Sequence, residues 1–393
     1  MITHSGRTLL AAVAASLMAS TAMAADTIKL GLSVPMSGGG AAWGLGSQWA
    51  CKEAAQEINA AGGVKVAGKV YEFSCIAYDN KYTSAEGTKV AQTLLNRDGV
   101  KFVVGIVGTP PYQALQSLSE RQGVLIFTHS WSSSTKGPKF PLTFTAANTP
   151  NEIFPSFIKY IASANPQAKT VALLGANDST GKEVEPKSLS AWKDAGVQVV
   201  GSDFYERGTT DFQPIALRLT SKSPAIIDLG AISPGDAGLI LKELAALGWK
   251  GVKAWGAGSG AEDVVATAGA AANGVYMSLG VPYGTSAVPG PLAKLNEKAL
   301  PVLGVSLGAS HIAVYDTVHA LKAGMEKAQS VEPTKVAAVL PSVRFNTLYG
   351  GTAGFGGTST YGSPQQTLLP YFVTQVREGK LVGVSRMDGP KGN

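Results

Sequence analysis

The sequence predicts an α/β protein made of two Rossmann-like, doubly wound lobes. Short β-branched runs alternate with helical patterns of roughly 10 to 15 residues, which is typical of βαβ units and parallel sheets. The alternation runs from Thr27 to Thr128, is interrupted by a cluster of Pro, Asn and Thr at 141–151, and then starts again. The chain has 393 residues, and at roughly 150 residues per domain this length fits two units.

The first lobe begins with a regular alternation of strands and helices. We expect strands at 27–34, 70–78, 101–107 and 124–128, and helices at 45–59, 84–96 and 111–121. The second lobe repeats the pattern after the interruption. Its expected helices are 153–164, 183–195, 211–220 and 235–247, and its expected strands are 170–175, 197–204, 225–229, 252–255 and 274–278.

In the section from residue 292 onward, the alternation of strands and helices stops. Helical patterns at 292–300, 306–327 and 333–340 follow one another without strands, 350–362 is rich enough in Gly, Thr and Ser to predict a loop, and a strand pair is expected at 371–377 and 381–385. Helices without a sheet of their own must cover a neighbouring sheet. The section therefore completes both lobes, and we predict 25–146 with 279–355 as lobe 1 and 147–278 with 356–393 as lobe 2.

The N-terminal 24 residues have the pattern of a cleaved secretory signal peptide. Arg7 precedes an apolar run from Leu9 to Met18, and Ala22-Met23-Ala24 provides the small residues of a cleavage site. The run is about half of the roughly 20 residues that a membrane span needs. Residue 25 is Ala and not Cys, so a lipid anchor is not indicated. We expect a soluble, exported product.

Two cysteines remain after this segment. Cys51 falls in a predicted helix and Cys75 in the strand that follows, so the two are neighbours in one βαβ unit. An even number of cysteines in an oxidising compartment favours a disulfide. Two buried free thiols are the alternative, because free cysteines pack as small hydrophobic side chains.

Composition and motifs exclude several classes of function. The net charge of +6 comes from dispersed residues, whereas a nucleic-acid interface needs a basic cluster. No H-E-x-x-H, C-x-x-C or G-x-S-x-G motif occurs, and the glycines at 44–46 and 175–181 do not match dinucleotide or phosphate loops. We interpret His129, His311 and His319 as packed or surface residues. We predict no enzyme activity, no cofactor and no metal.

Polar and aromatic residues follow the strands of the first lobe. In open α/β sheets, ligands bind where the carboxyl ends of strands lead into helix N-termini. The loops expected there contain hydroxyls and aromatic rings, which suit a small amphiphilic acid, although helix caps and turns use the same residue types. The candidate residues are Trp43, Thr109, Tyr112, Ser130, Trp131 and Ser132.

Several segments resemble the leucine/isoleucine/valine-binding proteins, which are periplasmic receptors of ABC importers with the type I binding-protein fold. The segments are Thr27-Ile-Lys-Leu-Gly-Leu-Ser-Val-Pro-Met-Ser-Gly38, Trp43-Gly44, Glu57-Ile-Asn-Ala-Ala-Gly-Gly63, Tyr78-Asp79 and Val103-Val-Gly105. The resemblance extends over the mature chain. It implies two lobes joined by a hinge of three crossover strands that close on a ligand.

The resemblance also implies roles for particular residues. The ligand carboxylate would be held by Thr109 and by the run Ser130, Trp131 and Ser132, with Trp43 as an aromatic wall. Thr180 and Ser259 would face the ligand from the second lobe. The partners implied are an amino acid or small carboxylate and the permease subunits of the importer, with the protein acting as a periplasmic monomer. A sensor that signals to a membrane receptor is the alternative.

Two departures from the family pattern bear on the ligand. The run after the third strand is Thr109-Pro110-Pro111-Tyr112, which keeps one hydroxyl and adds bulk. The acid that would pair with an amino-acid ammonium group aligns with Gly258. Glu262 and Asp263 are the alternative partners, although both fall within the next predicted helix. Because a buried ammonium group without a carboxylate is costly, the sequence favours a small organic acid, including an aromatic one, over a branched-chain amino acid.

Overall fold

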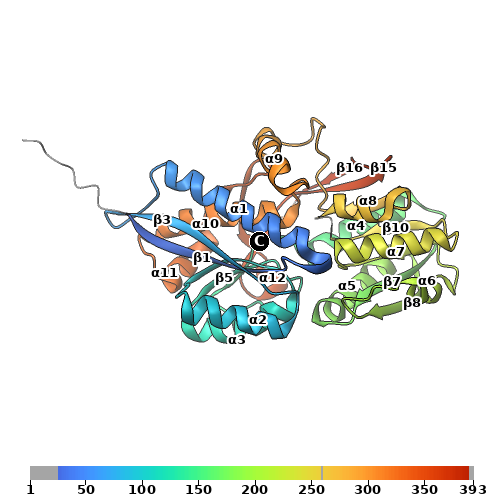
Figure 1. Cartoon of the computed structure of the whole chain (residues 1–393), viewed down its shortest axis with the longest axis horizontal. Helices are drawn as coiled ribbons and strands as arrows, with labels where there is room; N and C mark the ends of the chain where they lie inside the picture. Colours follow the sequence, from blue (N-terminus) through green and yellow to red (C-terminus); the bar gives the residue numbers. More distant parts are fainter. Residues whose placement is uncertain (1–24, 258–259, 389–393) are drawn as a thin grey trace, which may run out of the picture.

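The computed structural model describes residues 25–257 and 260–388. They form two α/β lobes that lie side by side (Figure 1). One lobe is built on a sheet of nine strands and the other on a sheet of seven, which confirms the predicted fold class. The predicted signal peptide at 1–24 and the candidate residue Ser259 lie outside the described residues.

The sheet of lobe 1 has the order β12-β13-β14-β6-β5-β4-β1-β3-β2. Its strands are β1 (Asp26–Val34), β2 (Val64–Val66), β3 (Lys69–Asp79), β4 (Phe102–Ile106), β5 (Leu125–Thr128), β6 (Thr143–Thr145), β12 (Arg344–Asn346), β13 (Thr352–Gly356) and β14 (Gln366–Leu368). The central strands β3, β1, β4, β5 and β6 pair in parallel. Antiparallel pairs occur at both edges, where β2 meets β3 and β12 meets β13.

Helices cover both faces of this sheet. They are α1 (Ala41–Ala60), α2 (Ser84–Gln92), α3 (Thr109–Gln122), α9 (Gly290–Leu303), α10 (Ala309–Ala328), α11 (Pro333–Val339) and the short α12 (Thr358–Tyr361). Val103 of β4 and Ile126 of β5 pack with α2 and α3. Their neighbours Val104 and Phe127 point to the opposite face, where α1 and α10 lie. Burial on both faces explains why these strands read as continuous apolar runs.

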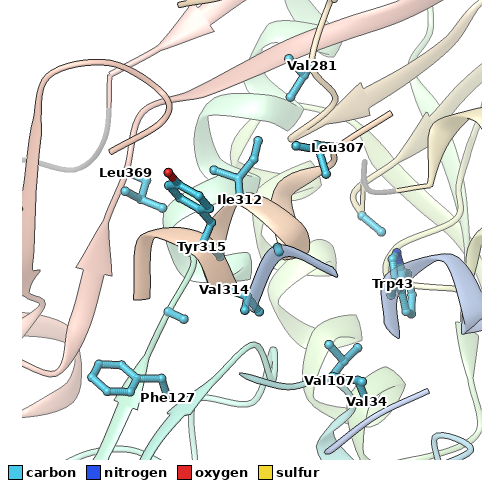
Figure 2. Packing of buried hydrophobic residues seen from close by; sticks show 14 of the residues in the cluster. Val34, Trp43, Val107, Phe127, Val281, Leu307, Ile312, Val314, Tyr315 and Leu369 are labelled. Atoms are coloured by element: carbon cyan, nitrogen blue, oxygen red, sulfur yellow. The ribbon is translucent and has the colours of Figure 1, made fainter. Parts of the chain in front are cut away.

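Helix α10 lies at the centre of the larger core cluster. Figure 2 shows Ile312 and Val314 projecting from α10 into a group of buried side chains. The group includes Val34, the last residue of β1, and Val107, which follows β4. Trp43 of α1 belongs to the same cluster. The core of lobe 1 therefore extends to the carboxyl ends of its central strands.

Lobe 2 repeats the arrangement with the strand order β16-β15-β11-β10-β9-β7-β8. Its strands are β7 (Thr170–Ala176), β8 (Gln198–Tyr205), β9 (Ile226–Asp228), β10 (Val252–Trp255), β11 (Val275–Ser278), β15 (Tyr371–Arg377) and β16 (Lys380–Met387). Its helices are α4 (Pro150–Ala164), α5 (Ser179–Asp194), α6 (Gln213–Thr220), α7 (Pro234–Ala246) and α8 (Ala261–Ala268). Helices α4 and α5 pack in one cluster, and α6, α7 and α8 in the other.

The chain crosses between the lobes after β6, after β11 and after β14. The last crossing lies between Leu368 and Tyr371, later than the predicted boundary at 355/356, because β14 joins the sheet of lobe 1. The segment 350–362, expected as a loop, contains β13 and α12. A Cβ atom at Gly354 would lie 2.7 Å from Nη1 of Arg344 on the neighbouring strand. A side chain at this position would have to displace the exposed Arg344 side chain, and the glycines of β13 make its composition resemble that of a loop.

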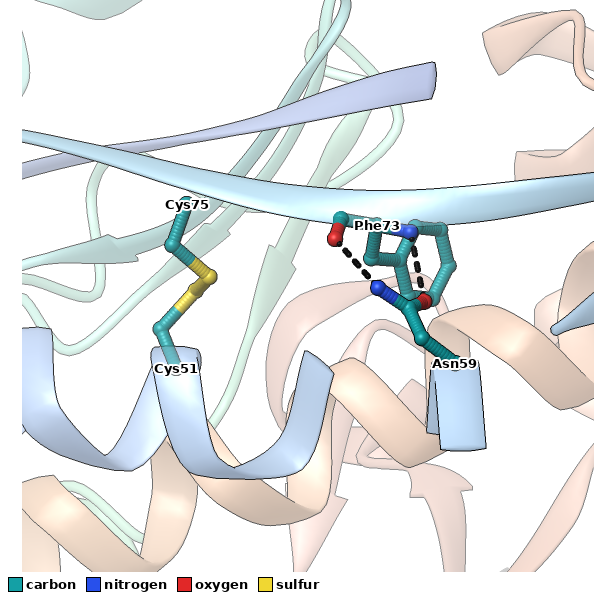
Figure 3. The surroundings of a disulfide bond; sticks show 4 residues. All are labelled: Cys51, Asn59, Phe73 and Cys75. Carbon is teal, nitrogen blue, oxygen red and sulfur yellow. Dashed lines mark hydrogen bonds between the residues drawn. A yellow bond between two sulfur atoms is a disulfide. The ribbon is translucent and has the colours of Figure 1, made fainter. Parts of the chain in front are cut away.

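Cys51 and Cys75 are joined in a disulfide, with their Cα atoms 6.2 Å apart. Figure 3 shows that the bridge ties α1 to β3. A second tie lies near it, because the Asn59 side chain accepts a hydrogen bond from the Phe73 N–H and donates one to the Phe73 carbonyl, each at 2.9 Å. The helix behind the first ligand loop is therefore fixed to the sheet at two points.

Removing the disulfide is expected to destabilise the protein. The bridged residues are 24 positions apart, and closing a loop of this size in the unfolded chain contributes about 3 kcal/mol. The double variant Cys51→Ala/Cys75→Ala should lose about that much unfolding free energy in urea titrations. Wild type unfolded under reducing conditions should match the variant. An unchanged urea midpoint in both cases would contradict the expectation.

Candidate ligand-binding site

A cavity lies between the two lobes at the carboxyl ends of both sheets. Its empty volume is about 550 Å³ when the part open to solvent is counted, and the centre of a water molecule has about 60 Å³ in which to move. Both lobes and the crossing segments contribute to its wall. The lining residues are Trp43, Tyr82, Val107, Gly108, His129, Trp131, Ala147, Asn148, Thr180, Ala231, Ala257, Leu279, Ala309 and Ser310.

Four helices begin at this cavity. Trp43 lies in the first turn of α1, Gly108 caps α3, Thr180 lies in the first turn of α5 and Ser310 in that of α10. A helix N-terminus carries a partial positive charge that favours anions. The backbone alone therefore gives the cavity a preference for negative charge.

Aromatic and aliphatic side chains form most of the wall. The rings of Trp43 and Tyr82 lie 6.1 Å apart, centroid to centroid. Trp131, after β5, meets Phe154 of α4 edge to face at 6.0 Å across the lobe boundary. Val107 and Leu279 add aliphatic surface. The cavity thus suits a ligand with an apolar body.

His129 is the polar side chain that stands out in the wall. It follows β5, is 8% exposed, and both of its ring nitrogens are buried without a hydrogen-bond partner among the described residues. Burial lowers its pKa to about 3, so the ring is neutral near pH 7. A neutral imidazole offers one donor and one acceptor. The sequence interpretation took His129 as a packed or surface residue, although it directly precedes the candidate Ser130.

Two predicted hydroxyl residues are engaged with each other. The Oγ1 atom of Thr109 and the Oγ atom of Ser130 lie 2.9 Å apart. The Thr109 N–H donates to Thr180 Oγ1 at 3.2 Å, and Pro110 and Pro111 have no N–H to offer. The start of α3 therefore contributes its dipole to the cavity, while its first three residues present no free backbone donor. Tyr112 is fully buried, and its hydroxyl donates to the Thr135 carbonyl at 3.0 Å.

The segment 130–134 after β5, here called the serine loop, binds the carboxylate of Glu183. Oγ of Ser132 lies 2.6 and 2.7 Å from the two carboxylate oxygens of Glu183, in α5 of the other lobe. The backbone N–H of Ser133 and the hydroxyl of Ser134 donate to the same carboxylate at 3.1 and 2.9 Å. Lys187, one turn further along α5, donates to Ser133 Oγ at 3.0 Å. These contacts join the lobes beside the cavity.

The structure thus divides the predicted residues into two groups. Trp43, Trp131 and Thr180 line the cavity. A second group, Thr109, Tyr112, Ser130 and Ser132, is buried beside it and makes the contacts described above. Their roles as ligand contacts remain predictions. Tyr82 and His129 line the cavity without having been singled out by the sequence.

Acidic side chains are absent from the described part of the wall, since none of the lining residues is Asp or Glu. Two acids near the starts of α5 and α7 have partners of their own. Asp178 forms an ion pair with Arg207 at 2.5 Å, and Asp236 accepts from the Tyr205 hydroxyl at 2.6 Å. The described residues also contain no group of three or more His, Cys, Asp or Glu arranged to hold a metal ion. Over 25–257 and 260–388, no helix is both long and apolar enough to cross a membrane.

Residues 27–380 match the model of the periplasmic binding protein family. The chain belongs to this family. It is 30% identical over 342 residues to the leucine-, isoleucine-, valine-, threonine- and alanine-binding protein of Pseudomonas aeruginosa, covering 86% of this chain and 88% of that protein. This confirms the predicted resemblance.

Solved structures show the same fold. A leucine-binding protein from Thermotoga maritima superposes with a TM-score of 0.78 at 19% identity, covering 92% of this chain and 99% of the other. An ABC transporter solute-binding protein from R. palustris, in complex with benzoate, gives a TM-score of 0.77 at 16% identity and covers 92% and 97%. At these identities the likeness concerns the fold.

Protonation of buried histidines should make the protein less stable in acid. Burial lowers the pKa of His129 to about 3 and that of His311 to about 4, whereas an unfolded histidine titrates near 6.5. Below about pH 6.5 the unfolded state therefore binds more protons, and the unfolding free energy should fall as the pH drops from 6.5 towards 3. Urea titrations at pH 7, 6, 5 and 4 measure this loss. The unfolding free energy of a His129→Leu variant should fall less over this pH range. An identical fall in the variant and the wild type would contradict a buried, neutral His129.

The contact between Glu183 and the serine loop should favour the closed arrangement of the lobes. Hydrogen bonds to charged groups contribute about 1.5 kcal/mol or more, so Glu183→Gln should lower the ratio of closed to open molecules by about tenfold. Fluorescence energy transfer between labels on the two lobes measures this ratio. Glu185→Gln is the matched control, because Glu185 lies on the same helix and accepts from Ser202 within lobe 2. Equal effects of the two variants would exclude the interlobe role.

Proposed function

We propose that the protein captures a small monocarboxylate without an ammonium group, preferably one with an aromatic ring, between its two lobes. The observation that carries the proposal is the polarity of the cavity. Four helix N-termini and the unpartnered His129 meet there, and none of the described lining residues is acidic. Such a wall favours an anion and offers no negatively charged side chain to a cation.

The ligand's two ends have separate environments. A carboxylate oxygen accepts well from the N–H of the neutral His129 ring and is stabilised by the helix dipoles. The apolar body packs against Trp43, Tyr82 and Trp131, the aromatic residues of the cavity wall. Both parts are needed, because the polar end fixes orientation and the apolar end supplies most of the buried area.

An amino acid is the second candidate. The Pseudomonas aeruginosa relative is named for binding leucine, isoleucine, valine, threonine and alanine, and it is more similar in sequence than the benzoate complex. An α-ammonium group, however, would be desolvated without an acidic partner among the described lining residues, which costs several kcal/mol. The charge of the wall therefore favours the organic acid.

The protein acts as the substrate-binding component of an ABC importer. Binding in a cavity walled by both lobes stabilises their closed arrangement, and a permease that recognises this arrangement receives the ligand. We infer a non-enzymatic role, a monomeric state and a periplasmic location reached through removal of residues 1–24. No nucleic acid takes part.

Calorimetric titration distinguishes the two ligand classes. Benzoate and 4-hydroxybenzoate should bind at least tenfold more tightly than leucine or isoleucine. His129→Leu should weaken benzoate by tenfold or more, because it removes the polar contact in the wall, while His129→Asn keeps a donor and an acceptor and should weaken it less. Tight binding of leucine with no heat from benzoate would overturn the proposal in favour of an amino acid.

A further inference from the structure

Tyr82 is held in a backbone conformation that bulky residues rarely adopt. Its φ is 58° and that of Lys81 is 48°, so two consecutive residues lie in the left-handed region. The turn is fixed by the preceding side chains, since Asp79 Oδ1 accepts from the Lys81 N–H and Asn80 Oδ1 from the Tyr82 N–H, each at 2.8 Å. Strain of this kind persists where the surroundings over-determine it, and it clusters at ligand-binding sites.

The buried Asn80 connects this turn to the central strands. Its Nδ2 donates to the carbonyl of Ser33, the penultimate residue of β1, at 2.8 Å and to the carbonyl of Val107, which follows β4, at 3.0 Å. The turn is therefore anchored to two neighbouring strands of lobe 1. It presents the Tyr82 side chain towards lobe 2.

Two residues of lobe 2 receive the Tyr82 side chain. The guanidinium carbon of Arg207 lies 3.8 Å from the centroid of the Tyr82 ring, and Thr180 Oγ1 lies 3.2 Å from the Tyr82 hydroxyl. Arg207 also forms an ion pair through its Nε with Asp178 of the same lobe. Its two terminal nitrogens are buried and have no hydrogen-bond partner among the described residues. The face of the Tyr82 ring is thus a main electrostatic neighbour of this charge.

We propose that Tyr82 and Arg207 form an interlobe clamp that makes the site selective for aromatic ligands. The inference rests on the proposed function and narrows it. Tyr82 belongs to lobe 1 and Arg207 to lobe 2, so the contact exists only when the lobes meet. The clamped ring lines the cavity opposite Trp43, tilted by 45° to it. Closure therefore completes the aromatic wall that a ring-bearing ligand contacts.

The physical basis is differential stabilisation of the closed form. A guanidinium stacked on an aromatic face is attracted by the negative potential of the ring. A planar ligand that packs against the wall formed by Tyr82 and Trp43 gains contact with a ring already fixed in place, which favours the closed arrangement over the open one. An aliphatic acid of similar size gains less from a flat wall and should depend less on the clamp.

The test compares two probes on matched variants. Benzoate serves as the aromatic probe and 4-methylpentanoate as the aliphatic one, each titrated by calorimetry. Tyr82→Leu and Arg207→Met should each weaken benzoate by at least tenfold, and by a factor at least three times the factor by which they weaken 4-methylpentanoate. Tyr82→Phe keeps the ring and should stay within threefold of wild type for both probes. Urea titrations confirm that each variant is folded.

A second tyrosine–arginine stack provides the control. Arg97 lies 5.4 Å from the Tyr78 ring centroid, within lobe 1, and neither residue lines the cavity. Tyr78→Leu and Arg97→Met should leave both affinities unchanged. Equal losses for the two probes, or no loss in the Tyr82 and Arg207 variants, would overturn the selectivity.

An error in the proposed ligand class would be seen in the wild type itself, and not only in the variants. If wild type binds neither carboxylate, the ligand class is wrong, and the clamp is then judged by energy transfer between lobe labels without ligand. Arg207→Met should lower the closed fraction at least threefold relative to Arg97→Met. An unchanged closed fraction would exclude the clamp in that case.

Discussion

The meeting of two parallel sheets at their carboxyl ends is the constraint on which the rest of the structure depends. Parallel strands need helical crossovers, so α1, α3 and α5 begin where β1, β4 and β7 end. Both lobes turn these ends towards one boundary, and the start of α10 joins them. The fold thus concentrates partial positive charge around a cavity before any side chain is considered. An acidic lining residue would cancel this effect, and the described wall has none.

Contact between the lobes is distributed over several places around the cavity. The Glu183 carboxylate in the serine loop and the Tyr82 ring under Arg207 are two of them. A third is a close approach of backbones, since a Cβ atom on Gly39 would lie 2.9 Å from Ser233 Oγ and one on Gly235 would lie 3.2 Å from the Gly39 Cα. Glycine at both positions lets η1 (Gly38–Gly40) and α7 touch. Because none of these contacts is large, a ligand bridging the lobes can contribute a substantial share of the closing free energy.

Local sequence signals predicted the central strands and most helices, because strands such as β4 and β7 are buried, largely apolar runs between helical periods. The same signals missed β13, because Gly354 and Gly356 give this strand the composition of a loop. At the site, loop position identified Trp43 and Trp131. It could not identify the partner of Ser132, because Glu183 is 51 positions away and comes from the other lobe. The neutral, unpartnered state of His129 likewise depends on burial that no local pattern encodes.

The two prolines at the start of α3 bear on how the site discriminates among ligands. Helix N-termini usually grip a carboxylate through free backbone N–H groups. Here Pro110 and Pro111 remove two such donors, and the third, on Thr109, is taken by Thr180. At this helix an anion meets a dipole without a set of directed hydrogen bonds, which leaves His129 as the main directional contact among the described side chains. A single polar contact fixes orientation weakly, so discrimination rests on the shape of the walls. Rigid aromatic rings, one of them held by a charge from the opposite lobe, are suited to that task.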